Sequence, residues 1–587
     1  MGTILHPVDE AVEQSDQQAA VGALSHRRQR VSAGGLKAAI AVVAVASVFL
    51  VAFPLFRLLQ RTIASGLDVF DRAKAVPGLS DAITNTLLLG AGSVVVAVFL
   101  GVILALAADR CGGRGSTLLR IVPVVPLMVP SLAAVIGWTF LLSPRVGYIN
   151  LLLRKTPFFS GVDGPINIYS RFWIIAATGV SLASFVYLFV SASLRAMGPD
   201  YRDAARVHGG RPLRVTLGII VPLLRPALVY SVITVFLLGL GQFTVPLILG
   251  AREHVHVLST VIFELRNSVP VDYALAAVLI SPIVLLGMVL LLFQRRVLRH
   301  ETRFQASASP PEVRETHLPS AMVLVGYGVI TVLLPILALV RTSLSHFWTG
   351  DLGLNDLTLD SFKSVMKDQG VKDALLTTLR TAGLATLILV PVGFLGALVT
   401  TGIVGTRRRS LGAVIDSAAA VPLAVPGAIY GFAMLLAFST WPFQLYGSPW
   451  LLVLGYTTIM LPHAVRMNAS ALRGIKIEHW HAAQVSGLPV TTSLFRILFP
   501  MVRTGVIYAS SLVFILLSHE FAVSVMVGTT HQQVAMSKLY SYWEYGQYPP
   551  VAALALIMVG FTTVLVIALF ALGGRRMVSQ LDEGVTT

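Results

Sequence analysis

The chain has 587 residues, of which 55% are hydrophobic and only 12% are charged. About a quarter of the residues of a typical soluble domain are charged, so this composition excludes an ordinary soluble protein. The net charge of +16 does not indicate nucleic-acid binding, because the Lys and Arg residues gather beside the ends of long apolar segments, as they do in membrane proteins.

The apolar residues form blocks that are long enough to cross a bilayer, since about 20 residues of helix span its hydrocarbon core. They predict an all-α, polytopic membrane protein. About twelve spans are expected, near residues 36–59, 83–108, 121–142, 172–193, 223–249, 272–294, 319–342, 376–402, 413–437, 449–465, 503–528 and 550–573.

The segment 1–35 before the first span is polar and ends with the basic residues Arg27, Arg28 and Arg30. Basic residues beside a span are held in the cytoplasm during insertion. We therefore expect a cytoplasmic N-terminal tail and, with an even number of spans, a cytoplasmic C-terminal tail over 577–587. The first span is too long for the core of a signal peptide and is expected to remain as an anchor.

The two halves of the chain resemble each other. Residues 194–250 align without a gap on residues 472–528. Upstream, "DAITNTL" at 81–87 is similar to "DALLTTL" at 373–379. Each half holds six spans in the same order, and the even number makes the two repeats parallel.

The repeats are assigned to residues 36–299 and 319–576. The stretch "HETRFQASASPPEVRETHL" at 300–318 has the Ser, Pro and charge content of an exposed linker. In the first repeat "VPLMVP" falls in the third span, and in the second repeat "VPLAVP" falls in the ninth. Proline disrupts helical hydrogen bonding, so both spans are expected to bend there.

A short helix is predicted between the fourth and fifth spans of each repeat. Both segments follow the pattern A-A-x-x-x-G-x(12)-P, and in the first repeat Gly209 or Gly210 is placed to end the helix. In the first repeat, acidic residues lie near the start of the helix, where the positive end of the helix dipole favours negative charge. The residues concerned are Asp203, Ala204, Ala205 and Gly209 in the first repeat and His481, Ala482, Ala483 and Gly487 in the second.

This repeated loop resembles the EAA loop of binding-protein-dependent ABC importer permeases, and the resemblance covers about residues 36–573. It implies the type I importer permease fold, with Asp203–Gly209 and His481–Gly487 as coupling helices for two copies of an ATPase subunit. It also implies an external substrate-binding protein, alternating access, and a location in the bacterial plasma (inner) membrane. The family's usual Glu is replaced by Asp203 and by His481, and the second coupling helix is therefore expected to contact its ATPase differently or with some pH dependence.

The chain itself is expected to be a transport subunit and not an enzyme. It contains no Gly-Lys dipeptide, so it cannot form a G-x-x-x-x-G-K-[ST] nucleotide loop. ATP and Mg²⁺ are accordingly assigned to the partner ATPase, and no cofactor is expected in this chain.

The segments "GQFTVPLILG" (241–250), "VLSTVIFELRNS" (257–268) and "SHEFAVSVMVGTT" (518–530) are similar to permeases of the ferric iron type. Ferric iron is the substrate that this resemblance implies. Thiamine, phosphonate and polyamine remain alternatives for the same machinery. A secondary carrier of the major facilitator type is the alternative from another class, although a carrier would have no reason to repeat the Ala-Ala-x-x-x-Gly loop.

Polar residues inside spans indicate either a translocation path or hydrogen bonds that brace neighbouring helices. Gln242 and Glu520 occupy equivalent positions of the two repeats, each followed by Phe, and His519 precedes Glu520. We expect these three residues to line the path near the axis that relates the repeats; the bracing interpretation stays open.

Other candidate sites are weaker. The one cysteine, Cys111, excludes an intrachain disulfide and any cysteine-based metal cluster. His254 and His256 lack a third ligand at suitable spacing, so no metal site is predicted. The aromatic stretch "YSYWEYGQY" at 540–548 is interpreted either as an interfacial aromatic belt or as a docking surface.

Overall fold

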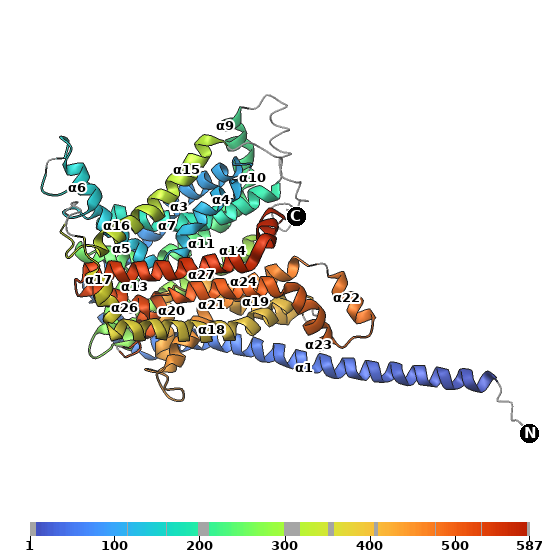
Figure 1. Cartoon of the computed structure of the whole chain (residues 1–587). Helices are drawn as coiled ribbons and strands as arrows, with labels where there is room; N and C mark the ends of the chain where they lie inside the picture. The colour runs from blue at the N-terminus through green and yellow to red at the C-terminus, as the bar shows by residue number, and fades with distance from the viewer. Residues whose placement is uncertain are drawn as a thin grey trace, which may run out of the picture. The chain divides into compact units, whose positions relative to one another are not determined.

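The computed structural model describes residues 7–113, 115–159, 161–197, 211–298, 317–349, 357–403, 409–475, 477–529 and 531–583, and it describes residues 7–33 by backbone alone. Within these ranges the regular structure is entirely helical (Figure 1). The linker predicted at 300–318 lies almost wholly outside the described residues, as does the first coupling segment, Asp203–Gly209.

The helices of the first repeat follow the order predicted from the apolar blocks, with short helices between the long ones. They are α1 (Pro7–Ala64), α2 (Gly66–Lys74), α3 (Leu79–Asp109), α4 (Ser116–Ile121), the 3₁₀ helix η1 (Val122–Met128), α5 (Ser131–Leu142), α6 (Tyr148–Arg154), α7 (Arg171–Met197), α9 (Pro212–Val215), the π-helix η2 (Thr216–Ile220), α10 (Val221–Leu223), α11 (Arg225–Leu240), α12 (Thr244–Leu249), the 3₁₀ helix η3 (Gly250–Arg252), α13 (Leu258–Asn267) and α14 (Tyr273–Leu298).

The second repeat shows the same succession of long and short helices. They are α15 (Leu318–Gly328), the π-helix η4 (Val329–Leu333), α16 (Leu334–Ser343), α17 (Asp360–Lys367), α18 (Gln369–Thr400), α19 (Arg409–Ala424), α20 (Gly427–Phe438), α21 (Pro449–Arg473), α22 (Glu478–Val485), α23 (Val490–Ser493), the π-helix η5 (Leu494–Leu498), α24 (Phe499–Ser518), α25 (Ala522–Val527), α26 (Ala535–Glu544) and α27 (Tyr548–Glu583).

Eight helices among the described residues are long and apolar enough to cross a membrane, and three bent helix pairs bring the number to eleven. The remaining predicted span, 449–465, lies within α21. This helix has 25 residues and also contains the polar residues Arg466 and Asn468. The all-helical membrane fold expected from the sequence is confirmed. Helix α1 begins at Pro7, inside the segment predicted as a polar tail.

Both predicted proline bends are present. The chain turns by 94° between Met128 and Ser131 and by 111° between Ala424 and Gly427. Pro130 and Pro426 adopt the same conformation at these corners, with φ of −53° in both and ψ of 123° and 139°. Proline lacks an amide N–H, so the preceding helix cannot continue its hydrogen bonds through the corner.

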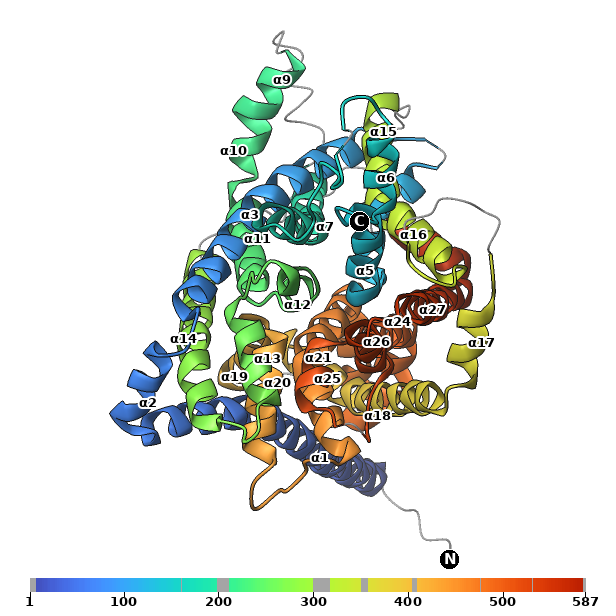
Figure 2. The same cartoon turned by 90° about the vertical axis from the view of Figure 1, so that its left-hand side faces the viewer.

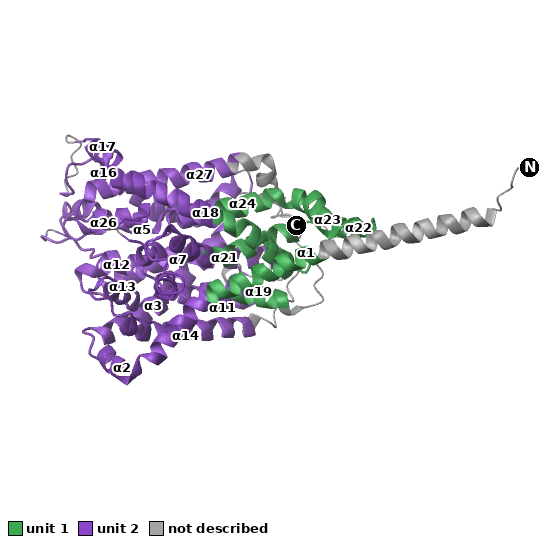
Figure 3. Cartoon of the chain, turned by 90° about the horizontal axis from the view of Figure 1, so that it is seen from below, with its two compact units in different colours: residues 1–52, 386–419, 460–513 green, residues 53–385, 420–459, 514–587 purple. Residues whose placement is uncertain are grey.

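The chain divides into two compact units that do not coincide with the two repeats (Figure 3). One unit comprises residues 1–52, 386–419 and 460–513, and the other comprises residues 53–385, 420–459 and 514–587. In the smaller unit, Leu36 and Ile40 of α1 share one apolar core with residues of α18, α22 and α24. The first span of the first repeat thus packs among helices of the second.

The larger unit contains the reciprocal arrangement. Helix α15, from the first span of the second repeat, packs on α3 and η1, and α16 packs on α5 (Figure 2). The hydroxyl of Tyr327 donates a hydrogen bond to the carbonyl of Val180 on α7 at 2.9 Å, and the hydroxyls of Tyr148 and Thr342 lie 2.8 Å apart. The first spans of the two repeats are therefore exchanged.

A glycine contact recurs in both repeats and fixes how two long spans meet. A Cβ added at Gly101 on α3 would lie 2.5 Å from Cβ of Val186 on α7. At the equivalent place in the smaller unit, a Cβ at Gly393 on α18 would lie 2.8 Å from Cβ of Ala464 on α21. Real Cβ atoms do not approach so closely, so glycine is required at both crossings.

Candidate translocation path and coupling helix

The predicted path residues lie at two breaks in the helices, and not within continuous spans as the apolar pattern predicted. Helix α11 ends at Leu240 before α12 begins at Thr244, and α24 ends at Ser518 before α25 begins at Ala522. The residues just before the new helices, Phe243 and Phe521, have nearly identical backbone angles of φ −119°, ψ −50° and φ −118°, ψ −43°. The structure thus brings Gln242 and Glu520 into equivalent positions, as the repeat implied.

The two breaks differ in how they are capped. The carboxylate of Glu520 accepts hydrogen bonds from the backbone N–H groups of Val523 at 2.8 Å and Ser524 at 3.0 Å. A negative charge is favourable at the positive end of a helix dipole, which explains why the helix restarts here. Gln242 offers a neutral oxygen that accepts one hydrogen bond, from the N–H of Phe243 at 3.2 Å.

Glu520 therefore caps the helix that follows it in the chain. The imidazole of its neighbour His519 has Nε2 buried, and this nitrogen makes no hydrogen bond within the part of the chain that the structure describes. His519 and Glu520 are partly accessible as whole residues, and Gln242 is as well.

Helix α25 is held at its other end by an arginine from the first repeat. Arg266 on α13 donates from Nε to the carbonyl of Met526 at 3.1 Å and from Nη2 to the carbonyl of Gly528. A cation is favourable at the carbonyl end of a helix, so α25 carries matched charges at its two ends. This contact ties the first repeat directly to the segment that follows Glu520.

Four aromatic side chains meet where the two helix breaks face each other. We call Phe243, Phe263, Phe521 and Tyr540 the aromatic quartet. Phe263 on α13 and Tyr540 on α26 occupy equivalent positions, the sixth residue of each helix.

The quartet is nearly symmetric. Within the repeats, the ring centroids lie 5.5 Å apart for Phe243 and Phe263 and 5.6 Å apart for Phe521 and Tyr540. Between the repeats, Phe243 and Phe521 stack at 5.7 Å, and Phe263 and Tyr540 meet edge to face at 5.9 Å. The three phenylalanines are buried. Aromatic pairs in these arrangements attract one another, so the four rings close on one another as a plug with contributions from both repeats.

A pair of threonines positions α13 and α26. The Oγ1 of Thr86 accepts a hydrogen bond from the N–H of Leu258 at 2.9 Å, and the Oγ1 of Thr378 accepts one from the N–H of Ala535 at 2.8 Å. These N–H groups belong to the first residue of each helix, where no intrahelical partner exists. The segments "DAITNTL" and "DALLTTL" are thus similar because each supplies a threonine that binds the first N–H of a short helix.

The second predicted coupling segment forms α22, an eight-residue helix. Trp480 is buried in the apolar core that also contains Leu494 and Leu498, and Ala483 is buried as well, so these two residues anchor the helix. His481 and Ala482 are exposed, and the side chain of Val485 is 88% exposed. The two alanines therefore differ: one packs inward and the other lies on the free face.

Gly487 ends α22 for a geometric reason. Its φ is +77°, in the left-handed region, and nothing lies within 4 Å of where a Cβ would stand. The N–H of Gly487 donates to the carbonyl of Gln484 at 3.0 Å, and that of Leu488 donates to the carbonyl of Ala483 at 3.2 Å. These two hydrogen bonds form a Schellman motif, which favours glycine at this position.

The residues that follow the coupling segments are also alike. The π-helices η2 and η5 stand at equivalent positions, and each runs into a proline, Pro222 or Pro500. A proline ring clashes with the carbonyl four residues earlier, and widening the turn relieves the clash. Of the first coupling segment itself, Asp203, Ala204, Ala205 and Gly209 lie outside the described residues.

The other candidates from the sequence are the two histidines His254 and His256 and the aromatic stretch 540–548. His256 pairs through Nδ1 with Glu264 at 3.1 Å, and the described ranges contain no group of three or more His, Cys, Asp or Glu side chains close enough for a metal ion. The rings of Trp543 and Tyr548 pack with Phe140 and Trp348. Trp543 and Tyr548 therefore take part in packing within the protein, whereas Tyr545 is exposed, and the belt and docking interpretations both stay predictions.

Sequence reasoning missed Phe263, Tyr540 and the two threonines. Thr86 and Thr378 lie in the matched segments "DAITNTL" and "DALLTTL", and aligning α13 with α26 pairs Phe263 with Tyr540. The signal was present for all four residues. The contacts that these residues make could not be predicted from the sequence, because ring packing and cross-helix hydrogen bonds depend on how the helices meet.

Comparison with known proteins agrees with this architecture. Residues 97–302 match the family of binding-protein-dependent transport system inner membrane components. The ferric transport system permease protein FbpB of Actinobacillus pleuropneumoniae is 22% identical over 506 residues, covering 84% of this chain and 70% of that protein. A probable ABC transporter permease protein of Sinorhizobium fredii is 24% identical over 494 residues, covering 81% of this chain and 83% of that protein.

A shorter relative bears on the internal repeat. The molybdenum transport system permease protein ModB of Mycobacterium tuberculosis is 28% identical over 249 residues, which are 90% of that protein but 42% of this chain. One permease of ordinary length thus corresponds to less than half of the chain. The chain is thus similar over most of its length to permeases of ABC importers, residues 97–302 match the family of binding-protein-dependent transport system inner membrane components, and the chain carries two permease-like repeats in one polypeptide.

Proposed function

We propose that this permease imports ferric iron, delivered by an extracytoplasmic binding protein and driven by two copies of a separate ABC ATPase. The observation that supports the substrate is the similarity to the ferric permease of Actinobacillus pleuropneumoniae over most of both chains. Thiamine, phosphonate and polyamine are the alternative cargoes for the same machinery. Relatives that match shorter stretches are named for molybdenum and for 2-aminoethylphosphonate.

In this proposal α22 is the coupling helix of the second repeat, and residues 203–209 supply its counterpart. The anchored Trp480 and the exposed Val485 support this role, because a helix that transmits force needs one face fixed in its own protein and one face free for a partner. ATP and Mg²⁺ bind to the ATPase. The N- and C-termini lie on the same, cytoplasmic side as α22.

The translocation path runs through the aromatic quartet, between Gln242 and Glu520. Both repeats contribute equally to the plug, so separating the repeats separates the rings, which is what alternating access requires. The single carboxylate at the break, Glu520, would attract a cation once the rings part. In the closed state this carboxylate caps α25.

Reconstitution tests the proposal. The permease is assembled with its ATPase in proteoliposomes, and ATP-driven uptake of ⁵⁵Fe³⁺ is measured with the iron-loaded binding protein outside. We expect uptake that needs all three proteins and that Val485→Asp abolishes together with binding-protein-stimulated hydrolysis. Stimulation by a thiamine, phosphonate or polyamine binding protein in place of the iron-loaded one would reject ferric iron. Failure of any ATPase to associate would reject the coupling role of α22.

A further inference from the structure

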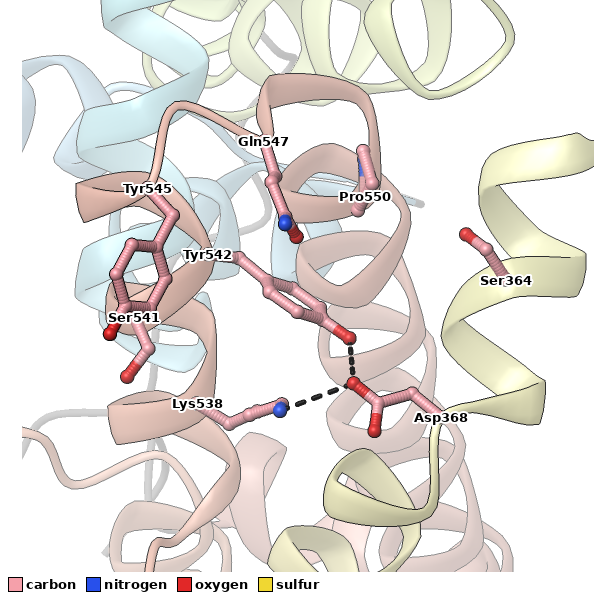
Figure 4. A pocket seen from close by; sticks show the side chains of 8 residues that line it. All are labelled: Ser364, Asp368, Lys538, Ser541, Tyr542, Tyr545, Gln547 and Pro550. Atoms are coloured by element: carbon pink, nitrogen blue, oxygen red, sulfur yellow. Dashed lines mark hydrogen bonds and ion pairs between the residues drawn. The ribbon is translucent and has the colours of Figure 1, made fainter. Parts of the chain in front are cut away.

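A pocket of about 580 Å³ opens beside α26, away from the quartet (Figure 4). It is lined by residues of α17, of α26 and of the start of α27, together with Asp368 between α17 and α18. One membrane-crossing segment separates α26 from α22 along the chain. On the proposed topology the pocket therefore faces the external side, where a binding protein must dock.

The acid in this pocket is held by three donors. Oδ1 of Asp368 accepts a hydrogen bond from the N–H of Gly370 at 2.7 Å, and Oδ2 accepts from Lys538 Nζ at 3.1 Å and from the hydroxyl of Tyr542. Partial burial raises the pKa of the Asp368 carboxyl, but the hydrogen bonds from Tyr542, Lys538 and Gly370 outweigh it and bring the pKa below its usual value. Asp368 thus stays charged and stays occupied.

The remaining polar groups include donors that are not used within the described residues. The ammonium group of Lys538 has three N–H donors, of which one goes to Asp368; its side chain is 19% exposed, with Nζ 5.0 Å from the centre of the Tyr542 ring. Among the described residues, the side chains of Tyr545 and Gln547 at the rim make no hydrogen bond. An ionised carboxylate only accepts hydrogen bonds, so a carboxylate is the group that these donors fit.

The lysine of this pocket has no counterpart at the aligned position of the first repeat. When α13 is aligned with α26 from their first residues, Lys538 corresponds to Val261, which is buried in an apolar cluster. The two nearly symmetric repeats thus differ at this position. A single binding protein, which has no twofold symmetry of its own, can use such a difference to select one orientation.

Helix α26 connects this pocket with the quartet. Lys538 and Tyr542 are one turn apart and face the pocket, whereas Tyr540, between them, points to the opposite side of the helix and into the ring cluster. A carboxylate that binds the spare N–H groups of Lys538 shares the ammonium charge with Asp368, the residue just before α18, and so weakens the pairing of Lys538 with Asp368. Loosening this tie frees α26 to carry Tyr540 away from Phe263.

We propose that this pocket receives an Asp or Glu side chain from the surface of the binding protein, and that Lys538 is the contact through which docking loosens the quartet. The proposal rests on the proposed function, because it presumes a binding protein that docks at this face. Three features favour a protein partner over a free anion: the positive charge of Lys538, the lack of a lysine at the aligned position of the first repeat, and the connection of α26 to Tyr540.

The test uses the full complex of permease and ATPase in nanodiscs, with the iron-loaded binding protein as the probe. Lys538→Met keeps most of the side-chain stem and removes the charge. We expect its Kd for the binding protein to rise about tenfold in low salt. The difference from wild type should shrink at high ionic strength, because salt screens a partly exposed charge. Lys363→Met, on the neighbouring α17 and paired with Asp360 at the surface, is the matched control and should bind as wild type does.

Tyr545→Ala provides a second test that does not disturb the fold, since this rim residue is 77% exposed. It should also weaken docking. Changing surface acids of the binding protein to Lys one at a time should identify one position whose change rescues Lys538→Glu. Unchanged affinity in both Lys538→Met and Tyr545→Ala would overturn the proposal, as would stabilisation of wild type by acetate without any effect of the variants on docking. Absence of ATPase stimulation in the wild-type complex would instead reject the proposed function.

Discussion

Phe243 and Phe521, one from each repeat, stack with ring centroids 5.7 Å apart and planes inclined by 27°. Each follows the polar residue at which its span breaks, and each has nearly the same backbone angles as the other. The internal repeat of the sequence is thus visible as a contact between equivalent atoms. With Phe263 and Tyr540 the pair forms the aromatic quartet, to which both repeats contribute.

The quartet is expected to seal the membrane through its rings and not through the hydroxyl of Tyr540. Tyr540→Leu should raise the passive Tl⁺ permeability of proteoliposomes and increase ATP hydrolysis in the absence of binding protein. Tyr540→Phe is the matched control, because it keeps the ring, and it should be as tight as wild type. Equal tightness of the Leu variant would show that the seal lies elsewhere.

Thr86 and Thr378 are expected to stabilise the fold to similar extents. Replacing either with Val keeps its shape but leaves the first N–H of α13 or α26 buried without a partner, which costs about 1–3 kcal/mol. Thermal unfolding in detergent should show a lower midpoint for both variants. Thr377→Val serves as the control, because the hydroxyl of Thr377 bonds only to the carbonyl of Asp373 in its own helix, and its midpoint should move little.

Gly487 is expected to matter for coupling beyond its effect on stability. A Cβ at a φ of +77° costs roughly 1–2 kcal/mol. Gly402, with a φ of +74° and an equally open surrounding, provides a matched control. Gly487→Ala and Gly402→Ala should lose similar stability, whereas only Gly487→Ala should reduce binding-protein-stimulated ATP hydrolysis. Equal hydrolysis by the two variants would argue against α22 as a coupling helix.

Arg266 is expected to require its guanidinium shape. Lys cannot reach the carbonyls of Met526 and Gly528 with two fixed donors, so Arg266→Lys should lose about 1.5–3 kcal/mol of stability and most of its transport. Arg145→Lys, at an exposed ion pair with Asp163, should change either property little. Chemical denaturation and iron uptake of the two variants, measured side by side, check this difference.

The interactions of the Asp368 carboxylate with Lys538 and Tyr542 are expected to persist through the physiological pH range. The pKa of its carboxyl in the folded protein lies below the ordinary value of 3.8, so the charged form stabilises the fold above that value. This contribution is lost only as the pH falls through the lower, folded pKa. The difference in unfolding midpoint between wild type and Asp368→Asn should therefore be constant from about pH 8 to pH 5 and should shrink below about pH 4. A difference that vanished already near pH 6 would contradict this assignment.

Much of the architecture follows from the sequence alone. Block length sets which segments cross the membrane, and the gapless match of 194–250 on 472–528 reveals two parallel repeats. The prolines of the third and ninth spans predict the two sharp corners, because a missing N–H acts on its own helix and needs no neighbour. Gly487 aligns with Gly209, one of the two glycines predicted to end the first coupling helix, and the need for a positive φ is likewise local.

Only the tertiary structure decided what depends on contacts between distant segments. The breaks at Gln242 and Glu520 were not predicted from the apolar pattern, and Phe243 and Phe521 beside them meet across the two repeats. The exchange of the first spans, the closure of the quartet and the pairing of Lys538 with Asp368 are of the same kind. Hydrophobicity places helices in the membrane but does not determine which helices pack together there. The partner of each helix is instead determined by shape, hydrogen bonds and charge once the helices meet.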